Sequence, residues 1–339
     1  MKYGIISDTH IKVYRKHSSF WQHIEKTFDF FYELCEEKKV DVIIHGGDVF
    51  HVKDTISTAA FVEANKIFKR FADRWPLHML VGNHDSVNKN DNKINLLEVF
   101  KSYAQVYEDY DKIENGTYVS HFLPYFDEHI MIQKIKEIKT VKGKKNYLFA
   151  HCGVRGFKFQ IDGYTDLQNE ITPELFKKFD QVILGHFHSH QKIGNMFYVS
   201  SPLQSKHGDE TGRHGFVFYD TADDSMEFVD NIYSPKFITI DLTKEKIPEM
   251  FTLENHFIRL KIQNKLSTEV LTRLKEKLLT KNYKVDFVFD YVPTNNSMAV
   301  IKDWDSVIQE DAETLIDSYL DTCSTVFDKE ELKKILYDN

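Results

Sequence analysis

Cysteine is scarce in this chain and has no recognisable pattern. The 339 residues contain three cysteines, Cys35, Cys152 and Cys323, which are widely separated and lack C-x-x-C spacing. An odd number of distant cysteines excludes both a disulfide framework and a cysteine-based zinc cluster. We therefore expect the protein to work in a reducing compartment.

Long apolar runs are also missing. No stretch approaches the roughly 18 consecutive apolar residues that a membrane-spanning helix needs. At the start, "MKYGIISDTH", polar residues directly follow a very short apolar run, so no signal peptide is readable. We expect a cytoplasmic protein that does not associate with a membrane.

Positive charge is in deficit. The chain has 44 Lys and Arg against 52 Asp and Glu, a formal net charge of −8. This excludes a generic polyanion binder that is held by bulk charge. Local basic patches remain open, as do metal ions that reverse the charge of a site.

Short apolar runs alternate with amphipathic helical stretches in the first part of the chain. Strands are predicted within 3–7, 40–48, 76–85, 146–153 and 180–186, and helices at 18–39, 57–75 and 93–103. Such alternation is typical of βαβ units around a central sheet. In these folds ligands bind beyond the carboxyl ends of the strands.

In the later part of the chain, predicted strands at first follow one another without helices between them. Strands at 196–201, 215–220 and 226–233 are expected to complete the sheets, and a compact unit of strands with one helix at 267–281 follows. We expect the apolar stripe of Val270, Leu271, Leu274 and Leu278 to pack that helix on a small sheet. The predicted domains are 1–235, 236–292, a linker at 293–306, and two helical patterns within 307–339.

Metal-competent side chains follow five of the predicted strands. They occur in "SDTH", "GGDVFH", "GNHD", "AHCG" and "GHFHSH", and they are Asp8, His10, Asp48, His51, Asn83, His84, Asp85, His151, His186, His188 and His190. A single such residue is usually structural. Five clusters that each follow an apolar run predict one shared site at the sheet edge.

The types of these side chains indicate the chemistry. Aspartate, histidine and one asparagine, without cysteine, suit Mn²⁺, Fe²⁺, Zn²⁺ or Mg²⁺. Their number suits two ions, because a single tetrahedral site needs only about four ligands. Two ions can clamp the attacking and leaving oxygens of a phosphoryl displacement. The residues therefore predict metal-assisted hydrolysis of a phosphate ester.

In their order, these motifs resemble the calcineurin-like metallophosphoesterase superfamily. Within it they are most similar to the SbcD or Mre-type nucleases of DNA double-strand-break repair, including the phage recombination endonuclease subunits. The motif match covers 5–190. The resemblance implies an α/β fold, a four-layer αββα sandwich with a small α/β capping domain and a C-terminal helical segment that binds a partner.

The resemblance also implies roles for individual residues. His84 would act on the scissile phosphate as a general acid, His51 would lie beside it, and Asp85 would orient its ring. The alternative for His51 is a core-edge histidine satisfied by the backbone, and His190 is expected to be a solvated surface residue. The implied metal ligands are Asp8, His10, Asp48 and His188 for one ion, and Asp48, Asn83, His151 and His186 for the other.

The activity implied by the resemblance is that of a DNA nuclease. It would be an exonuclease on duplex ends and an endonuclease on single strands, with two divalent ions, expected to be Mn²⁺ with Mg²⁺, Fe²⁺ or Zn²⁺ open. The implied partners are DNA, a second copy of the chain bound through 57–102, and an SMC-like ABC ATPase of the SbcC/Rad type bound by the C-terminal helices. Its place would be the cytoplasm of a bacterium or of a phage-infected host.

Two other readings remain open. One is a metal-dependent protein or small-molecule phosphatase or phosphodiesterase of the same fold, although the chain reads "GDVFHVKD" and "GNHD" where Ser/Thr phosphatases carry GDxxDRG and GNHE. The other is a non-catalytic scaffold for the ATPase. Contact with DNA phosphates would need local basic groups. The candidates are Lys12, Arg15, Lys16, Lys53, Lys89, Lys93, Lys206, His207 and Arg213.

Overall fold

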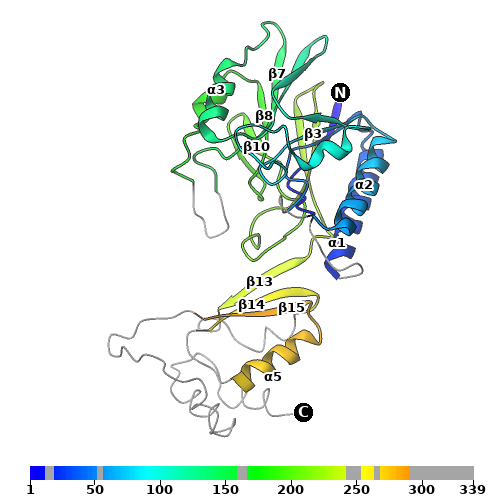
Figure 1. Cartoon of the computed structure of the whole chain (residues 1–339), viewed down its shortest axis with the longest axis vertical. Coiled ribbons are helices and arrows are strands. Elements are labelled where there is room, and N and C mark those ends of the chain that lie inside the picture. The colour runs from blue at the N-terminus through cyan, green and yellow to red at the C-terminus, as the bar shows by residue number, and fades with distance from the viewer. Residues whose placement is uncertain (12–18, 52–55, 159–165, 242–252, 263–267, 290–339) are drawn as a thin grey trace. The chain divides into compact units, whose positions relative to one another are not determined.

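The chain divides into two compact units. The computed structural model describes residues 1–11, 19–51, 56–158, 166–241, 253–262 and 268–289 (Figure 1). The first unit is Met1–Ser234, and the second begins at Pro235. The predicted linker and terminal helices, 293–306 and 307–339, lie outside the described residues. In the described part of the chain, no helix has the length and apolar character required to cross a membrane.

The first unit contains two six-stranded sheets, of which the first has the order β12-β11-β1-β2-β3-β4. Neighbours from β1 to β4 are parallel, whereas β11 and β12 are antiparallel additions. The carboxyl ends of β1, β2 and β3 therefore meet at one edge. The strands are β1 (Lys2–Ile6), β2 (Val42–His45), β3 (Leu77–Leu80), β4 (Gln105–Tyr107), β11 (Gly215–Asp220) and β12 (Ser225–Asp230).

The second sheet has the order β5-β6-β7-β8-β10-β9. Its central neighbours β6, β7, β8 and β10 are parallel, and the register places His151 at the end of β7 opposite Gly185 at the end of β8. The strands are β5 (Asp111–Glu114), β6 (Tyr118–Leu123), β7 (Lys145–His151), β8 (Gln181–Gly185), β9 (Gln191–Ile193) and β10 (Met196–Tyr198).

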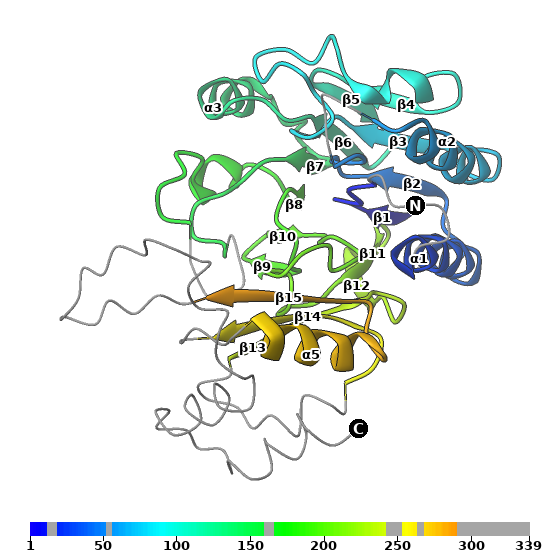
Figure 2. The same cartoon turned by 60° about the horizontal axis from the view of Figure 1, so that its bottom comes forward.

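The two sheets pack face to face and are covered by helices on their outer sides. Between them, the rings of Tyr3 and Phe149 meet at 5.4 Å within a shared apolar cluster. Outside the first sheet lie α1 (Ser19–Glu37) and α2 (Thr58–Ala72), with Phe31 stacked on Phe216 of β11. Outside the second lies α3 (Glu128–Glu137), which buries Met131. Figure 2 shows the layers, and they confirm the predicted αββα sandwich.

The predicted helix at 93–103 is wrong in type and length. The structure has a 3₁₀ helix there, η1 (Leu96–Phe100), with the Asn95 side chain accepting a hydrogen bond from the amide of Leu97. Leu97 and Phe100 are both buried, a spacing of three that suits one 3₁₀ turn. The Asn95 cap sets the start of η1, and β4 begins at Gln105, five residues after η1 ends. A second 3₁₀ helix is η2 (Pro173–Phe176).

The second unit is a small parallel sheet with one helix. Its described strands are β13 (Lys236–Asp241), β14 (His256–Ile262) and β15 (Lys284–Phe289), in that spatial order. Between β14 and β15 the chain forms α5 (Thr268–Leu279), which buries Leu274 and Leu278 against the sheet. The predicted packing of this helix is confirmed, and the role of the unit as a capping domain stays a prediction.

Candidate metal centre

The loops that follow the strands hold their polar side chains on a strained backbone. The loops after β1 and β2 are joined by backbone bonds from Asp8 N to Gly47 O and from His10 N to Asp48 O, of 2.9 and 3.1 Å. Residues other than glycine rarely adopt positive φ, and such strain gathers at functional sites. Positive φ is found at Asp8 (52°), His10 (44°), Asp48 (55°) and His186 (106°).

One cluster of predicted ligands consists of Asp8, His10 and His188. The Nε2 atoms of His10 and His188 face each other at 3.0 Å. The backbone amide of His186 donates to both carboxylate oxygens of Asp8, at 3.0 Å each. Asp8 and His10 are buried, so this cluster is largely shielded from water.

The second cluster gathers around the amide oxygen of Asn83. This Oδ1 lies 3.1 Å from Nε2 of His151 and 2.9 Å from Nδ1 of His186. Asp48 joins the two clusters, because its Oδ2 lies 3.5 Å from Nε2 of His151 and 3.7 Å from Nε2 of His10. The structure thus brings all seven predicted metal ligands together, with one carboxylate oxygen between the clusters.

The residues of both clusters fit divalent cations. The Nδ1 atom of His10 is buried without a hydrogen-bond partner, while its Nε2 points at another imidazole nitrogen. Lone pairs from imidazoles, carboxylates and one amide that converge in a buried site form a donor set for Mn²⁺, Fe²⁺, Zn²⁺ or Mg²⁺. Buried charges also need a counter-charge or a coordinated metal.

Burial and mutual charge set the protonation of these groups. Burial raises the pKa of Asp8, and it lowers the pKa of His186 to about 3, which keeps that imidazole neutral. For His151, burial alone would lower the pKa, but the neighbouring carboxylate of Asp48 raises it to about 9. For Asp48, burial alone would raise the pKa, but His151 lowers it. A cation in the cluster would take the place of the His151 proton beside Asp48.

Two glycines permit the close approach of the ligand loops. A Cβ on Gly82 would lie 2.2 Å from Oδ1 of Asp48. Gly47 has φ of 105°, and a Cβ there would lie 2.4 Å from Nδ1 of His151. Both distances are shorter than any real contact, so a side chain at either position would displace a ligand.

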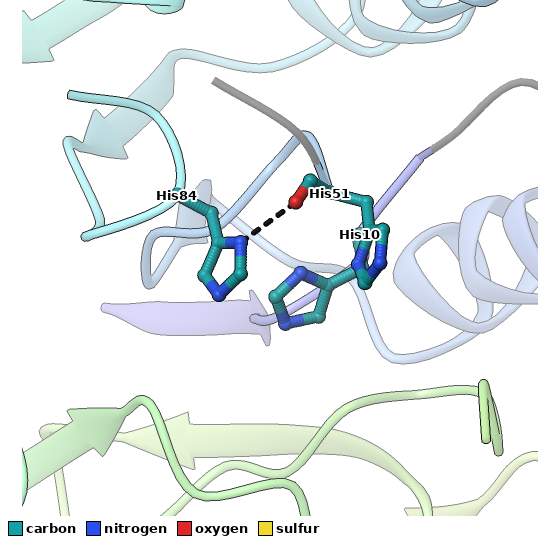
Figure 3. Close-up of side chains that lie close together, drawn as sticks. All are labelled: His10, His51 and His84. Carbon is teal, nitrogen blue, oxygen red and sulfur yellow. Dashed lines mark hydrogen bonds between the residues drawn. The ribbon is translucent and has the colours of Figure 1, made fainter. Parts of the chain in front are cut away.

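His84 lies beside the first cluster. Its Nδ1 donates to the backbone carbonyl of His51 at 2.7 Å (Figure 3). Its backbone amide donates to Oδ1 of Asp48 at 2.8 Å. The His84 ring centroid is 4.9 Å from that of His10 and 5.8 Å from that of His51. Because Nδ1 is engaged by a carbonyl, the Nε2 of His84 is the ring atom left for a substrate.

The prediction that Asp85 orients the His84 ring is wrong. The buried Asp85 carboxylate accepts three backbone amides, from Gly82 at 3.0 Å, Phe50 at 3.1 Å and Val49 at 3.2 Å. Burial, and then the charge of Asp48, raises its pKa to about 7. Asp85 therefore joins the loops after β2 and β3, and the His84 ring is held by the carbonyl of His51.

His190 is not the solvated residue that we expected. It is half-buried, its Nδ1 lies 2.6 Å from the carbonyl of Tyr198, and its ring stacks on Phe228 with centroids 4.2 Å apart. His190 thus contacts both sheets, because Tyr198 belongs to β10 of the second sheet and Phe228 to β12 of the first.

The basic residues that are candidates for DNA contact differ in their exposure and in their partners. Arg213 is engaged by both carboxylate oxygens of Asp230, at 3.0 and 2.6 Å, so its guanidinium is already paired. Lys89, Lys93 and Lys206 are exposed. His207 bonds to Glu210 at 3.1 Å. Lys12, Arg15, Lys16 and Lys53 lie outside the described residues.

One contact at the site was missed in the sequence. Asp209 lies 3.1 Å from Nδ1 of His188. It follows no apolar run and stands 21 residues away, so motif spacing gave no signal. The only hint was a run of Ser, Gly and His after β10, which is typical of a loop built around hydrogen bonds.

The chain is similar in sequence to proteins of a bacteriophage and of archaea. The chain is 26% identical over 204 residues to "Exonuclease subunit 1" of Enterobacteria phage T4, covering 59% of this chain and 58% of that protein. It is 28% identical over 201 residues to the DNA double-strand break repair protein Mre11 of Saccharolobus solfataricus, covering 56% of this chain and 49% of that protein. The Mre11 of Sulfurisphaera tokodaii is 23% identical over 289 residues, covering 82% and 70%.

The chain spans little more than half of the phage protein and about half of the first archaeal one. The predicted resemblance to Mre-type proteins is nevertheless confirmed. Residues 1–190 match the family model described as calcineurin-like phosphoesterase, and this range holds every predicted metal ligand. The match also confirms the predicted enzyme class, a hydrolase that acts on phosphoester bonds. The chain belongs to the calcineurin-like phosphoesterase family.

Proposed function

We propose that this protein is a two-metal-ion nuclease that hydrolyses the phosphodiester bonds of DNA. Its action would be exonucleolytic on duplex ends and endonucleolytic on single strands. The observation that carries the proposal is the position of Asp48, whose Oδ2 lies within 3.7 Å of a histidine from each cluster. A carboxylate shared in this way is what two neighbouring cations require.

The two ions would be held by separate sets of ligands around Asp48. When bound, they would neutralise phosphoryl oxygens and lower the pKa of an attacking water. Mn²⁺ is the expected ion, and Mg²⁺, Fe²⁺ and Zn²⁺ share the same donor preferences. We assign Asp8, His10, Asp48 and His188 to one ion, and Asp48, Asn83, His151 and His186 to the other.

The residues of the chain supply the proton transfer. Cleavage of a phosphodiester leaves an alkoxide oxygen that needs a proton, and a positioned imidazole is the usual donor. The His51 carbonyl fixes the His84 ring through Nδ1 at 2.7 Å, so Nε2 of His84 would deliver the proton to the leaving oxygen. The His51 ring lies nearly parallel to that of His84, and we propose that it shapes the substrate side of this pair.

DNA as the substrate is supported by the relatives. The phage relative is an exonuclease subunit, and the archaeal relatives are DNA double-strand break repair proteins. We extend the proposal to an SMC-like ATPase partner bound through 307–339, to a cytoplasmic location, and to a homodimer formed through α2 and η1. On these two elements Val62 and Val99 are 40% and 39% exposed, which supports a contact surface.

The test compares wild-type protein with His84→Ala on linear duplex DNA, single-stranded circles and phosphopeptides in Mn²⁺. We expect the wild type to cleave both DNAs and His84→Ala to lose about 10²–10⁴ in rate while binding the same amount of metal. The matched control is His129→Ala, which removes an exposed histidine on α3 and should leave the rate unchanged.

Two results would overturn the assignment. Full DNA cleavage by His84→Ala would remove His84 from the mechanism. Hydrolysis of phosphopeptides without cleavage of DNA would replace the nuclease with a phosphatase of the same fold.

A further inference from the structure

The carboxylate of Asp209 lies directly behind one of the metal ligands. Its Oδ1 is 3.1 Å from Nδ1 of His188, while the other ring nitrogen of His188 faces His10 inside the cluster. Asp209 is 3% exposed. A carboxylate so deeply buried has to be stabilised by its partners, and His188 is one of them.

The loop around Asp209 holds this carboxylate in place. Its Oδ2 accepts hydrogen bonds from the backbone amide of Ser205 at 2.9 Å and from the Ser205 hydroxyl at 3.0 Å. The carbonyl of Asp209 lies 2.8 Å from Nε2 of the buried His214. The loop is also tied to the ligand itself, because the amide of Ser201 donates to the carbonyl of His188 at 3.0 Å. The His188–Asp209 pair is therefore fixed from several sides.

This contact decides which nitrogen of His188 carries the hydrogen. Oδ2 of Asp209 already accepts two hydrogen bonds from Ser205, and Oδ1 faces Nδ1 of His188, so the carboxylate is the acceptor of this pair. The hydrogen must then sit on Nδ1 of His188. The lone pair is left for Nε2, the atom that faces the cluster, and the added negative charge makes that nitrogen a better ligand.

Among the residues that the structure describes, no carboxylate takes the same position behind a histidine of the second cluster. There the Nδ1 of His151 donates to the backbone carbonyl of Gly46 at 2.8 Å, which carries no net charge. Asp48 is shared by the two clusters. Besides the shared Asp48, the Asp8 cluster therefore has two carboxylates: Asp8 within the cluster and Asp209 behind His188. The other cluster has only the neutral amide of Asn83 in addition to Asp48 and its histidines.

We propose that Asp209 is a positioning residue that acts through His188 and makes the Asp8 cluster the tighter of the two cation sites. This inference rests on the pair of metal sites proposed above. The two sites then fill in order as the divalent ion becomes available, and the protein can hold one ion before it is competent for hydrolysis.

The test is a titration of the metal-free protein with Mn²⁺. Binding is measured by calorimetry and by the electron spin resonance signal of free Mn²⁺. We expect two binding events in the wild type. Asp209→Ala should weaken the tighter event about 10–100-fold and leave the weaker one unchanged. Asp209→Asn should lose less, since an amide oxygen still accepts from Nδ1 of His188. In a His188→Ala background, Asp209→Ala should have no further effect.

Asp224→Ala is the matched control, because its carboxylate accepts the hydroxyls of Tyr147 and Tyr219 at the opposite end of β7 from His151. This variant should keep both affinities. The inference is overturned if Asp209→Ala leaves the tighter event unchanged, or weakens both events alike. A wild-type protein that binds no Mn²⁺ would overturn the metal centre as well, whereas two wild-type events that ignore Asp209 would overturn only this inference.

Discussion

Burial lowers the pKa of individual histidines both in the metal centre, as at His186, and away from it. His78 on β3 shows the effect without nearby ligands. Its ring stacks on Phe122 with centroids 5.5 Å apart, and its Nδ1 lies 2.7 Å from the Tyr107 hydroxyl. Burial lowers the pKa of His78 to about 4, so the folded protein disfavours its protonated form.

His78 should therefore make the protein sensitive to acid. The unfolded chain takes up this proton near pH 6.5 and the folded chain only near pH 4. The contribution of His78 to stability is thus complete above pH 6.5 and is lost as the pH falls toward 4, by up to about 1.4 kcal/mol per pH unit. Urea unfolding between pH 7 and 4.5 should show a shallower loss in His78→Gln than in the wild type. Equal slopes would contradict the account.

At this scale the sequence predicted which residues lie together but not all of their contacts. The proposed ligands could be found because each follows a strand, and parallel strand ends meet at one edge. The partners of Asp85 and His190 could not, because they depend on which backbone groups the loops bring within reach. Asp209 was out of reach for the same reason: its link to His188 exists only after the loop beyond β10 has folded back.

At the scale of the elements, a single side chain joins the loop after β2 to the loop after β3. Asp85 accepts the amides of Gly82, Val49 and Phe50, and it is completely buried. These loops also carry Asp48 and Asn83. The position of the shared carboxylate thus depends on a residue that touches no substrate.

Asp85→Ala should be strongly destabilising. It would leave three buried amides without acceptors, each costing about 1–3 kcal/mol. We expect the free energy of unfolding to fall by several kcal/mol and Mn²⁺ affinity to fall with it, as measured by urea unfolding and metal titration. The control is Asp41→Ala, which removes an exposed carboxylate that accepts one amide, from Lys2 at 2.8 Å. Similar losses in the two variants would show that Asp85 has no special role.

The long helices were predictable, whereas the short elements were not. In α1 the buried side chains of Phe20, Ile24, Phe28 and Phe31 recur every three or four residues, which identifies the helix. Strand β5 has the sequence DKIE and is exposed throughout, so no alternation marks it. It forms because it pairs with β6, a contact that a local pattern does not contain.

At the scale of the whole molecule, the centre joins the two sheets of the first unit. Asp8, Asp48 and Asn83 follow strands of the first sheet, whereas His151 and His186 come from the second. Neither sheet alone carries the full set of ligands that we propose for either ion. Metal binding is therefore coupled to the packing of the sheets, and divalent ions should stabilise the folded unit.

Anomalous scattering from crystals of the protein soaked in Mn²⁺ would show whether the Asp48 carboxylate holds two cations. We expect two Mn²⁺ peaks, one at His10 and His188 and the other at His151 and His186, with the Asp48 carboxylate bound to both. A single ion, or two ions of which only one touches Asp48, would contradict it.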